Sequence, residues 1–297
     1  MEQMRLTISD SDLPGLFAVA DEFSIRGQRT TLLCSRIRLW GAVIAALGGV
    51  VNWSRPGLNP WAALTVVGFA AALTAEIVLL SRRPERAWYS GRAVAESVKT
   101  LAWRFSVGGD PFPAGLPPRH AQDLLRARLS GLVTGIRFPV VLPHDAMATS
   151  TAMGTARAAS FEERKTAYLA CRIQDQQDWY GKKARINDRS EARWRIALII
   201  GEVTAVLLAV ARMAGLWDVD LAGILAALVG SGAGWMALKQ YANLAEAYSV
   251  ASMELVLTHG RLTAADEGEW SQAVADAEDA ISREHTMWLA SRSGQAL

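Results

Sequence analysis

The chain has 297 residues, of which 51% are hydrophobic and 20% are charged, and its formal net charge at pH 7 is only +2. This near balance of charge argues against a nucleic-acid partner, which would need a strongly basic surface. A mean hydropathy of +0.14 is low for a protein made only of membrane spans. We therefore expect roughly half of the chain in lipid and half in water.

Four apolar runs occur as two closely spaced pairs, and each run can reach the length that a bilayer core of about 30 Å requires. The predicted spans are residues 37–53 and 61–80 in the first pair and residues 195–213 and 219–239 in the second. Lys and Arg are sparse in the short turns and dense on the flanks, which places both termini and the central region in the cytoplasm. The alternative is a set of buried core helices in a soluble protein.

Helices are expected before and after each pair of spans. The first leads from residue 11 into the first span, and residues 85–105 form another after the second span. Ser160 and Glu163 match a capping box, which predicts the start of a long helix that runs into the third span. The last predicted helices cover residues 239–262 and 265–291.

The two halves of the chain share one order of elements: a charged helix, two spans and a returning helix. Both copies begin on the same side of the membrane, so the repeat is parallel. We predict an all-α membrane protein with four transmembrane helices as two hairpins and with long helices extending into a cytoplasmic helical bundle. Its two-span modules are residues 1–106 and 146–297. Residues 107–145 join them as a Pro/Gly-rich connector that contains a short helix.

Two carboxylates, Glu76 and Glu202, lie within predicted spans. Charge at membrane depth is costly and usually faces a partner or water. We expect Glu202 and Glu76, together with the hydroxyl of Thr204, to line a polar pathway. The alternatives are a buried ion pair or hydrogen bond and, for Glu76, a side chain that extends to the nearby interface.

Small residues recur at intervals of four in two spans, and such ladders let helices approach closely in lipid. The ladders predict either an oligomer interface or packing within a hairpin. Their members are Gly41, Ala45 and Gly49 in the first span and Ala226, Gly230 and Gly234 in the fourth.

The charged stretch before the third span places polar and aromatic residues at helical spacing. They are Arg172, Asp175, Gln176, Trp179 and Lys183. We interpret them as one face of a coupling helix between the cytoplasmic bundle and the spans, with ordinary packing of the returning helices as the alternative.

The sequence shows no catalytic pattern. Its four histidines are scattered without metal-ligand spacing, and no serine lies in a nucleophile elbow. Cys34 and Cys171 both precede spans on the cytoplasmic side, so we expect free thiols. We predict that the protein is not an enzyme and uses no cofactor or metal.

Residues 147–194 resemble the SLATT superfamily, which includes the DUF4231 proteins. The residues that carry this resemblance are Met147, Arg164, Tyr168, Leu169, Arg172, Ile173, Asp175, Gln176, Trp179, Tyr180, Lys183, Ala184 and Asn187. The first half is similar to a second SLATT subtype. Its matching residues are Trp88, Arg92, Ala95, Glu96, Lys99, Trp103, Arg104 and the GGDPF segment that follows.

The resemblance implies two spans per module and a pore-forming effector of a bacterial conflict or antiviral defence system. Such effectors accompany nucleotide-generating synthetases or SLOG sensors and permeabilise the inner membrane when activated. This chain shows no sensor domain, so a nucleotide second messenger or a cytoplasmic sensor protein is the expected signal. We expect a homo-oligomeric ion channel or pore in the inner membrane. The alternative is a non-conducting membrane scaffold that recruits a cytoplasmic partner.

Overall fold

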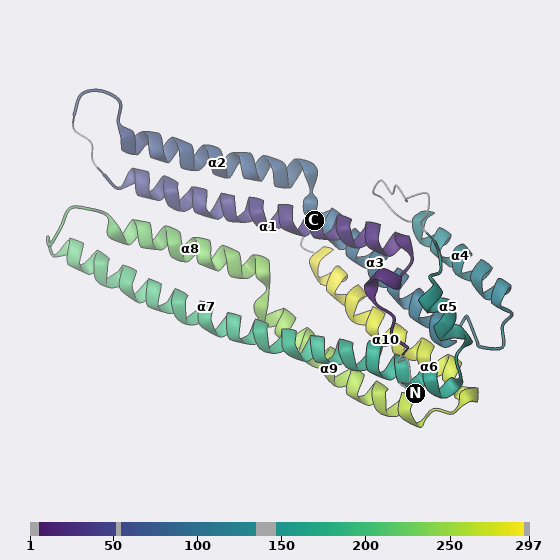
Figure 1. Ribbon diagram of the computed structural model, residues 1–297. Coiled ribbons are helices and arrows are strands. Elements are labelled where there is room, and N and C mark those ends of the chain that lie inside the picture. The colour runs from purple at the N-terminus through teal and green to yellow at the C-terminus, as the bar shows by residue number, and fades with distance from the viewer. Residues whose placement is uncertain (1–5, 52–54, 135–146, 294–297) are drawn as a thin grey trace. The chain divides into compact units, whose positions relative to one another are not determined.

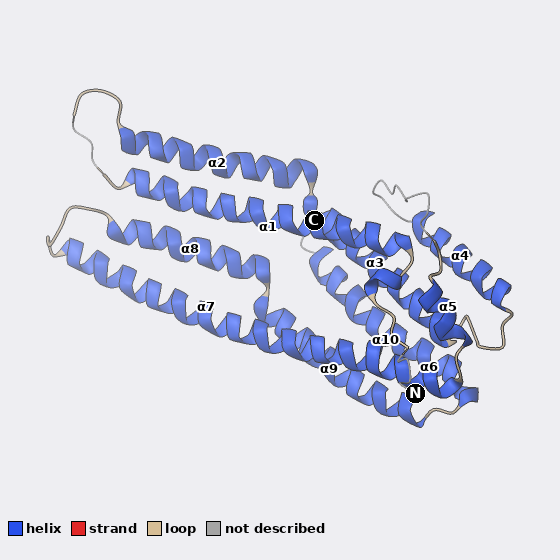
Figure 2. Ribbon diagram, viewed as in Figure 1, coloured by secondary structure: helices blue, strands red, loops and turns tan. Residues whose placement is uncertain are grey.

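The computed structural model describes residues 6–51, 55–134 and 147–293, and it describes the side chains of the last helix as far as Ser282. Figure 2 shows helices joined by loops, and no strand occurs in these described ranges. The prediction of an all-α protein is therefore confirmed. The end of the first predicted span and part of the predicted connector lie outside the described residues, at positions 52–54 and 135–146.

The described part of the chain contains eight long helices and four short segments. Figure 1 labels the α-helices. The long helices are α1 (Gly15–Gly49), α2 (Pro60–Arg82), α3 (Pro84–Val107), α4 (Pro118–Thr134), α7 (Asp175–Met213), α8 (Leu221–Lys239), α9 (Tyr241–Ala264) and α10 (Glu267–Ser293). The short segments are the 3-10 helix η1 (Asp10–Asp12), α5 (Thr151–Ala158), α6 (Phe161–Tyr168) and the π-helical η2 (Leu169–Gln174), which connects α6 to α7.

Within the described residues, four helical segments are long and apolar enough to cross a membrane, as the sequence predicts. They are Gly15–Gly49, Pro60–Arg82, Phe161–Met213 and Leu221–Ala264. Polar residues fix where two of them begin. The side chain of Asn59 accepts hydrogen bonds from the backbone at the start of α2, and that of Asp220 does so at the start of α8.

The chain forms two compact units. The unit that we call the membrane unit comprises Gln28–Glu85 and Arg185–Ala245 and contains the apolar parts of the four segments. The unit that we call the helical unit comprises Met1–Gly27, Arg86–Ala184 and Glu246–Leu297. Helices α1, α3, α7 and α9 contribute residues to both units, α3 only through its first two residues in the membrane unit.

The helical unit is built around α3, because this helix buries side chains in two hydrophobic cores. One face, including Val98 and Phe105, packs with the start of α1 and with α4 and α5. Another face, with Trp103 and Val107, packs with η2, α9 and α10. Helical periodicity places these two sets of side chains on different sides of α3.

The membrane unit packs its hairpins through small residues. A Cβ atom on Gly68 of α2 would lie only 2.6 Å from the carbonyl oxygen of Gly41 and 2.6 Å from the backbone nitrogen of Ala45, both on α1. In the second hairpin, a Cβ on Gly201 of α7 would lie 2.7 Å from a methyl group of Val229. The absence of a side chain therefore permits the close approach of each helix pair.

The two small-residue ladders have different surroundings. Gly41 and Ala45 pack against α2 within their own hairpin, which is the alternative that the sequence left open for them. Gly49 and Gly230 have nothing within 4 Å of the position that a Cβ would take. Ala226 is exposed, and Gly234 lies against Leu39 of α1.

We predict that Gly68→Ala destabilises the first hairpin. The added methyl group meets backbone atoms, and overpacking of this kind costs about 1–3 kcal/mol. The midpoint of thermal unfolding in detergent, followed by circular dichroism, should fall. Gly49→Ala is the matched control, because its methyl group enters open space; an equal fall in both variants would contradict the packing described here.

Candidate functional site

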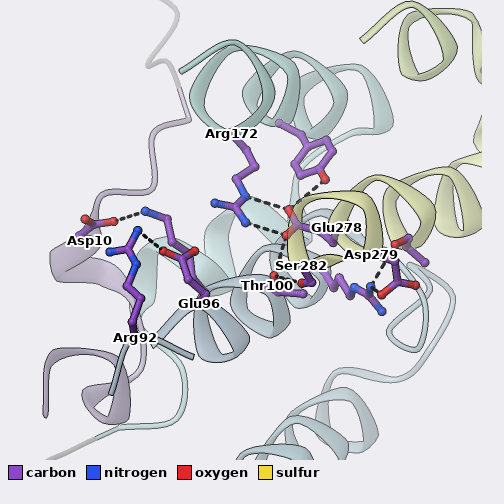
Figure 3. Close-up of polar contacts among 12 residues, drawn as sticks. Asp10, Arg92, Glu96, Thr100, Arg172, Glu278, Asp279 and Ser282 are labelled. Atoms are coloured by element: carbon purple, nitrogen blue, oxygen red, sulfur yellow. Dashed lines mark hydrogen bonds and ion pairs between the residues drawn. The ribbon is translucent and has the colours of Figure 1, made fainter. Parts of the chain in front are cut away.

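The most deeply buried charged side chains of the helical unit form an ion pair between η2 and α10 (Figure 3). The Nε and Nη2 atoms of Arg172 donate to the two carboxylate oxygens of Glu278 over 2.9 and 2.8 Å. The side chain of Arg172 is 1% exposed and that of Glu278 is 0% exposed. The two-point geometry matches a planar guanidinium to a planar carboxylate.

Two further donors complete the hydrogen bonding of Glu278. The hydroxyl of Tyr168, the last residue of α6, donates to one oxygen over 3.0 Å, and that of Thr100 on α3 donates to the other over 2.9 Å. One carboxylate thus holds together three parts of the helical unit, as Figure 3 shows for its contacts with Arg172 and Thr100. The Nη1 atom of Arg172 is buried without a hydrogen-bond partner among the described atoms.

Burial and charge set the protonation of this cluster. Burial, reinforced by the negative charge of Glu278, raises the pKa of Tyr168 well above its ordinary value of 10.0. Burial lowers the pKa of Arg172, but the charge and hydrogen bonds of Glu278, together with the charge of Glu96, outweigh this effect, so the pKa of the guanidinium is raised. The arginine is held charged and the tyrosine neutral, so the cluster is suited to positioning helices and not to proton transfer.

Sequence reasoning identified Arg172 but missed Glu278. The signal lay in the last helix, where apolar residues recur at helical spacing. Trp270, Val274 and Ile281 are buried on that face, and Glu278 is buried among them. A carboxylate on an otherwise apolar helical face needs a buried partner.

A second set of cations covers the carboxyl end of α3, where helix carbonyls lack partners within the helix. Arg157 donates to the carbonyl oxygens of Phe105, Phe112, Pro113 and Leu116. The carbonyl of Val107 accepts from Arg164 and from the indole nitrogen of Trp270. No local pattern in the sequence indicates these contacts, because the partners are far apart along the chain.

The five residues of the predicted coupling helix do not form one contact face. Arg172 is buried and Asp175 is exposed. The π-helical segment η2 ends between them and adds a residue to the turn, so an α-helical spacing no longer predicts which side chains align.

The later members of the set lie farther along α7. Trp179 packs against Tyr248 of α9, with ring centroids 5.4 Å apart. The ammonium group of Lys183 lies over the ring of Trp179. Gln176 is half-buried. The coupling role of this segment stays a prediction.

The two carboxylates within the spans have different surroundings. Glu76 on α2 pairs with Arg38 on α1 over 2.7 Å, and both side chains are partly exposed. Glu202 on α7 is exposed, and no partner for its carboxylate occurs among the described side chains. Thr204 is exposed as well, and its hydroxyl donates to the carbonyl of Ile200 in its own helix.

Much of the apolar part of α7 is uncovered, although one side of it packs against α8. No residue from 181 to 213 is buried. The large apolar side chains exposed there include Ile196, Ile199, Ile200, Val203, Val206, Leu207 and Val210. Lipid or another protein chain must cover this surface in a membrane.

We predict that Glu278→Gln strongly destabilises the helical unit, because it leaves the guanidinium of Arg172 buried without a counter-charge. Breaking a buried pair in this way costs about 3–5 kcal/mol. Chemical denaturation of the purified protein measures the loss. Glu22→Gln is the matched control: its carboxylate pairs with Arg26 at the surface of the same unit, so its loss should cost below about 1 kcal/mol. Equal losses in the two variants would contradict the role given to burial.

We predict that Tyr168 adds a fall in stability above pH 10. Its pKa is raised in the folded protein, so the unfolded chain releases this proton first as the pH rises through 10.0. Below that pH the contribution of Tyr168 is fully present. Above it, stability should fall by up to about 1.4 kcal/mol per pH unit for this one proton.

Unfolding of Tyr168→Phe across the alkaline range tests this expectation. The variant loses one hydrogen bond at every pH, but its stability should fall less steeply above pH 10 than that of the unmodified protein. Tyr89→Phe removes a hydroxyl outside the cluster and should keep the steep fall. Parallel curves for Tyr168→Phe and the unmodified protein would refute the prediction.

No group of His, Cys, Asp and Glu side chains that could hold a metal ion occurs in the described part of the chain. Two protein-family models match the chain. A family model described as SMODS and SLOG-associating 2TM effector domain 3 matches residues 14–165, including the predicted connector. A second, described as SMODS and SLOG-associating 2TM effector domain 1, matches residues 168–288. No curated protein and no solved structure matches the chain.

The two matched segments follow one another directly and together cover nearly all of the described helices. Each contains one pair of helices long and apolar enough to span a membrane. The chain is a membrane protein that belongs to the SLATT family, and it carries two of the family's two-span effector domains in tandem.

Proposed function

We propose that the chain forms an oligomeric channel that changes the permeability of a bacterial inner membrane when it is activated. The observation that carries this proposal is the exposed carboxylate of Glu202 within the apolar part of α7. An ionised carboxylate facing lipid is unfavourable, whereas one facing a water-filled path between subunits is solvated. Glu202 would face such a path, and cations would be favoured in it.

The bare surface of the spans supports an oligomer. Two hairpins leave α7 without buried residues along its apolar part, so a single copy encloses no conduit there. The open space at Gly230 on α8 lets the backbone of another helix approach closely. Gly49 offers the same possibility at the end of α1.

The family supports an effector role. The two matching models are described as effector domains associating with SMODS and SLOG, so a defence effector is the role that we propose for this chain. The helical unit would receive the signal, either a nucleotide second messenger or a sensor protein. Positive flanking residues favour a cytoplasmic position for the helical unit and both termini.

Reconstitution of the purified protein in liposomes tests the channel. Potassium flux and its preference over chloride flux are measured with and without nucleotide extracts from cells. We predict that Glu202→Gln lowers the preference for cations, because it removes the negative charge from the path. Glu254→Gln is the matched control: it makes the same change at an exposed position of α9 in the helical unit.

Two results would count against the proposal. Equal ion selectivity in Glu202→Gln and the unmodified protein would remove Glu202 from the path. No flux under any condition, from protein that is folded and membrane-inserted, would favour the non-conducting scaffold. Glu76→Gln provides a third comparison of ion selectivity, because the carboxylate of Glu76 is already paired with Arg38.

A further inference from the structure

The membrane unit contains a cavity of about 470 Å³ between α1, α7 and α8. This volume lies within the range of about 300–1,000 Å³ that is usual for ligand sites. Contacts between the hairpins form one side of it. Ser231 of α8 donates a hydrogen bond to the carbonyl of Leu39 on α1, and Gly234 packs against the same residue. The cavity is therefore present in a single copy of the chain.

The lining changes in character along the helices. Arg36 and three tryptophans, Trp40, Trp194 and Trp235, lie near the ends of the spans at which the chain passes into the helical unit. Tryptophan and arginine at this level are typical of the membrane interface. From there the cavity follows α8 back to Leu225, ten residues before Trp235, which corresponds to about 15 Å of helix.

The deeper part of the cavity is apolar. Its side chains include Val43, Leu198, Leu228 and Val229. An apolar groove about 15 Å long that starts at the interface and runs toward the bilayer centre can accept an acyl chain. A soluble ligand would gain little there, because the groove offers few polar partners.

The interfacial end carries positive charge. The guanidinium of Arg36 lies 5.1 Å from the ring centroid of Trp235, and the ammonium group of Lys239 lies 5.8 Å from it. No ion pair of Arg36 occurs among the described side chains. None of the described residues that line the cavity is an aspartate or a glutamate. A basic pocket between spans at the interface is suited to a phosphate-bearing headgroup.

We propose that this cavity binds one anionic phospholipid of the surrounding membrane, with its phosphate at Arg36 and Lys239 and an acyl chain along Leu198, Leu228 and Val229. The proposal depends on the chain residing in a membrane and is independent of channel activity. The lipid would fill the space between the two hairpins and hold α7 and α8 against α1.

Native mass spectrometry of the purified protein tests the site. Dioleoyl phosphatidylglycerol is titrated onto delipidated protein, with dioleoyl phosphatidylcholine as the uncharged comparison. Phosphatidylglycerol should bind more tightly, as a single saturable adduct. Arg36→Gln should weaken it about fivefold, in line with the contribution of one arginine near an anionic headgroup, whereas Arg36→Lys should retain it.

Two more variants separate the parts of the site. Arg195→Gln removes a positive charge at the same end of α7 but outside the cavity, so binding should be unchanged. Ala197→Trp fills the groove and leaves Arg36 in place, so it should also weaken binding. Circular dichroism and size-exclusion chromatography establish that each variant is folded. If Arg36→Gln fails this check, Arg36→Lys and Ala197→Trp still decide the outcome.

Several results would overturn the proposal. Equal affinity for the two lipids, with no effect of Arg36→Gln, would mean that the groove takes up any apolar chain. Displacement of the lipid by glycerol 3-phosphate at equal concentration would identify a soluble anion as the ligand. An Ala197→Trp variant that still binds normally would place the lipid elsewhere. A dimer that forms only after lipid removal and blocks lipid binding would assign the groove to a second copy of the chain.

Discussion

The helical unit depends on the pairing of one buried arginine with one buried carboxylate. Removing both Arg172 and Glu278 from water costs several kcal/mol for each ion, and only a close, two-point contact offsets that cost. The contact forms in only one arrangement of the two helices. Any other arrangement that buries the two charges apart is strongly disfavoured. Hydrophobic contact alone is less selective, because an apolar face tolerates small rotations and shifts. The hydroxyls of Tyr168 and Thr100 tighten the constraint further.

The spans were predictable because the physics leaves few choices. An apolar run of about 20 residues that must satisfy its own backbone hydrogen bonds in lipid forms a helix. Short turns then make hairpins. The capping box at Ser160 was also predictable, since its two partners lie three residues apart in the sequence. Both of its hydrogen bonds are present in the structure. Each of these features is local in the sequence.

Features that depend on distant residues were not predictable. Arg157 binds carbonyl groups more than forty positions earlier in the chain, and nothing near it in sequence announces them. The spacing of the predicted coupling face is altered for a different reason: the π-helical turn at Leu169–Gln174 interrupts the α-helical periodicity between Arg172 and Asp175. The ladder of Gly41 and Ala45 had two possible partners, and only the position of Gly68 distinguishes them.

Helix α3 has a consequence for how the helical unit melts. Its Val98 and Phe105 belong to a core made within the first SLATT domain, whereas its Trp103 and Val107 belong to a core otherwise made by the second. One helix thus contributes side chains to both hydrophobic cores. Loss of either core exposes a face of that helix and removes support from the other. We therefore expect the helical parts of the two family domains, although separate in sequence, to unfold in one cooperative transition, so neither domain should be exchangeable by itself.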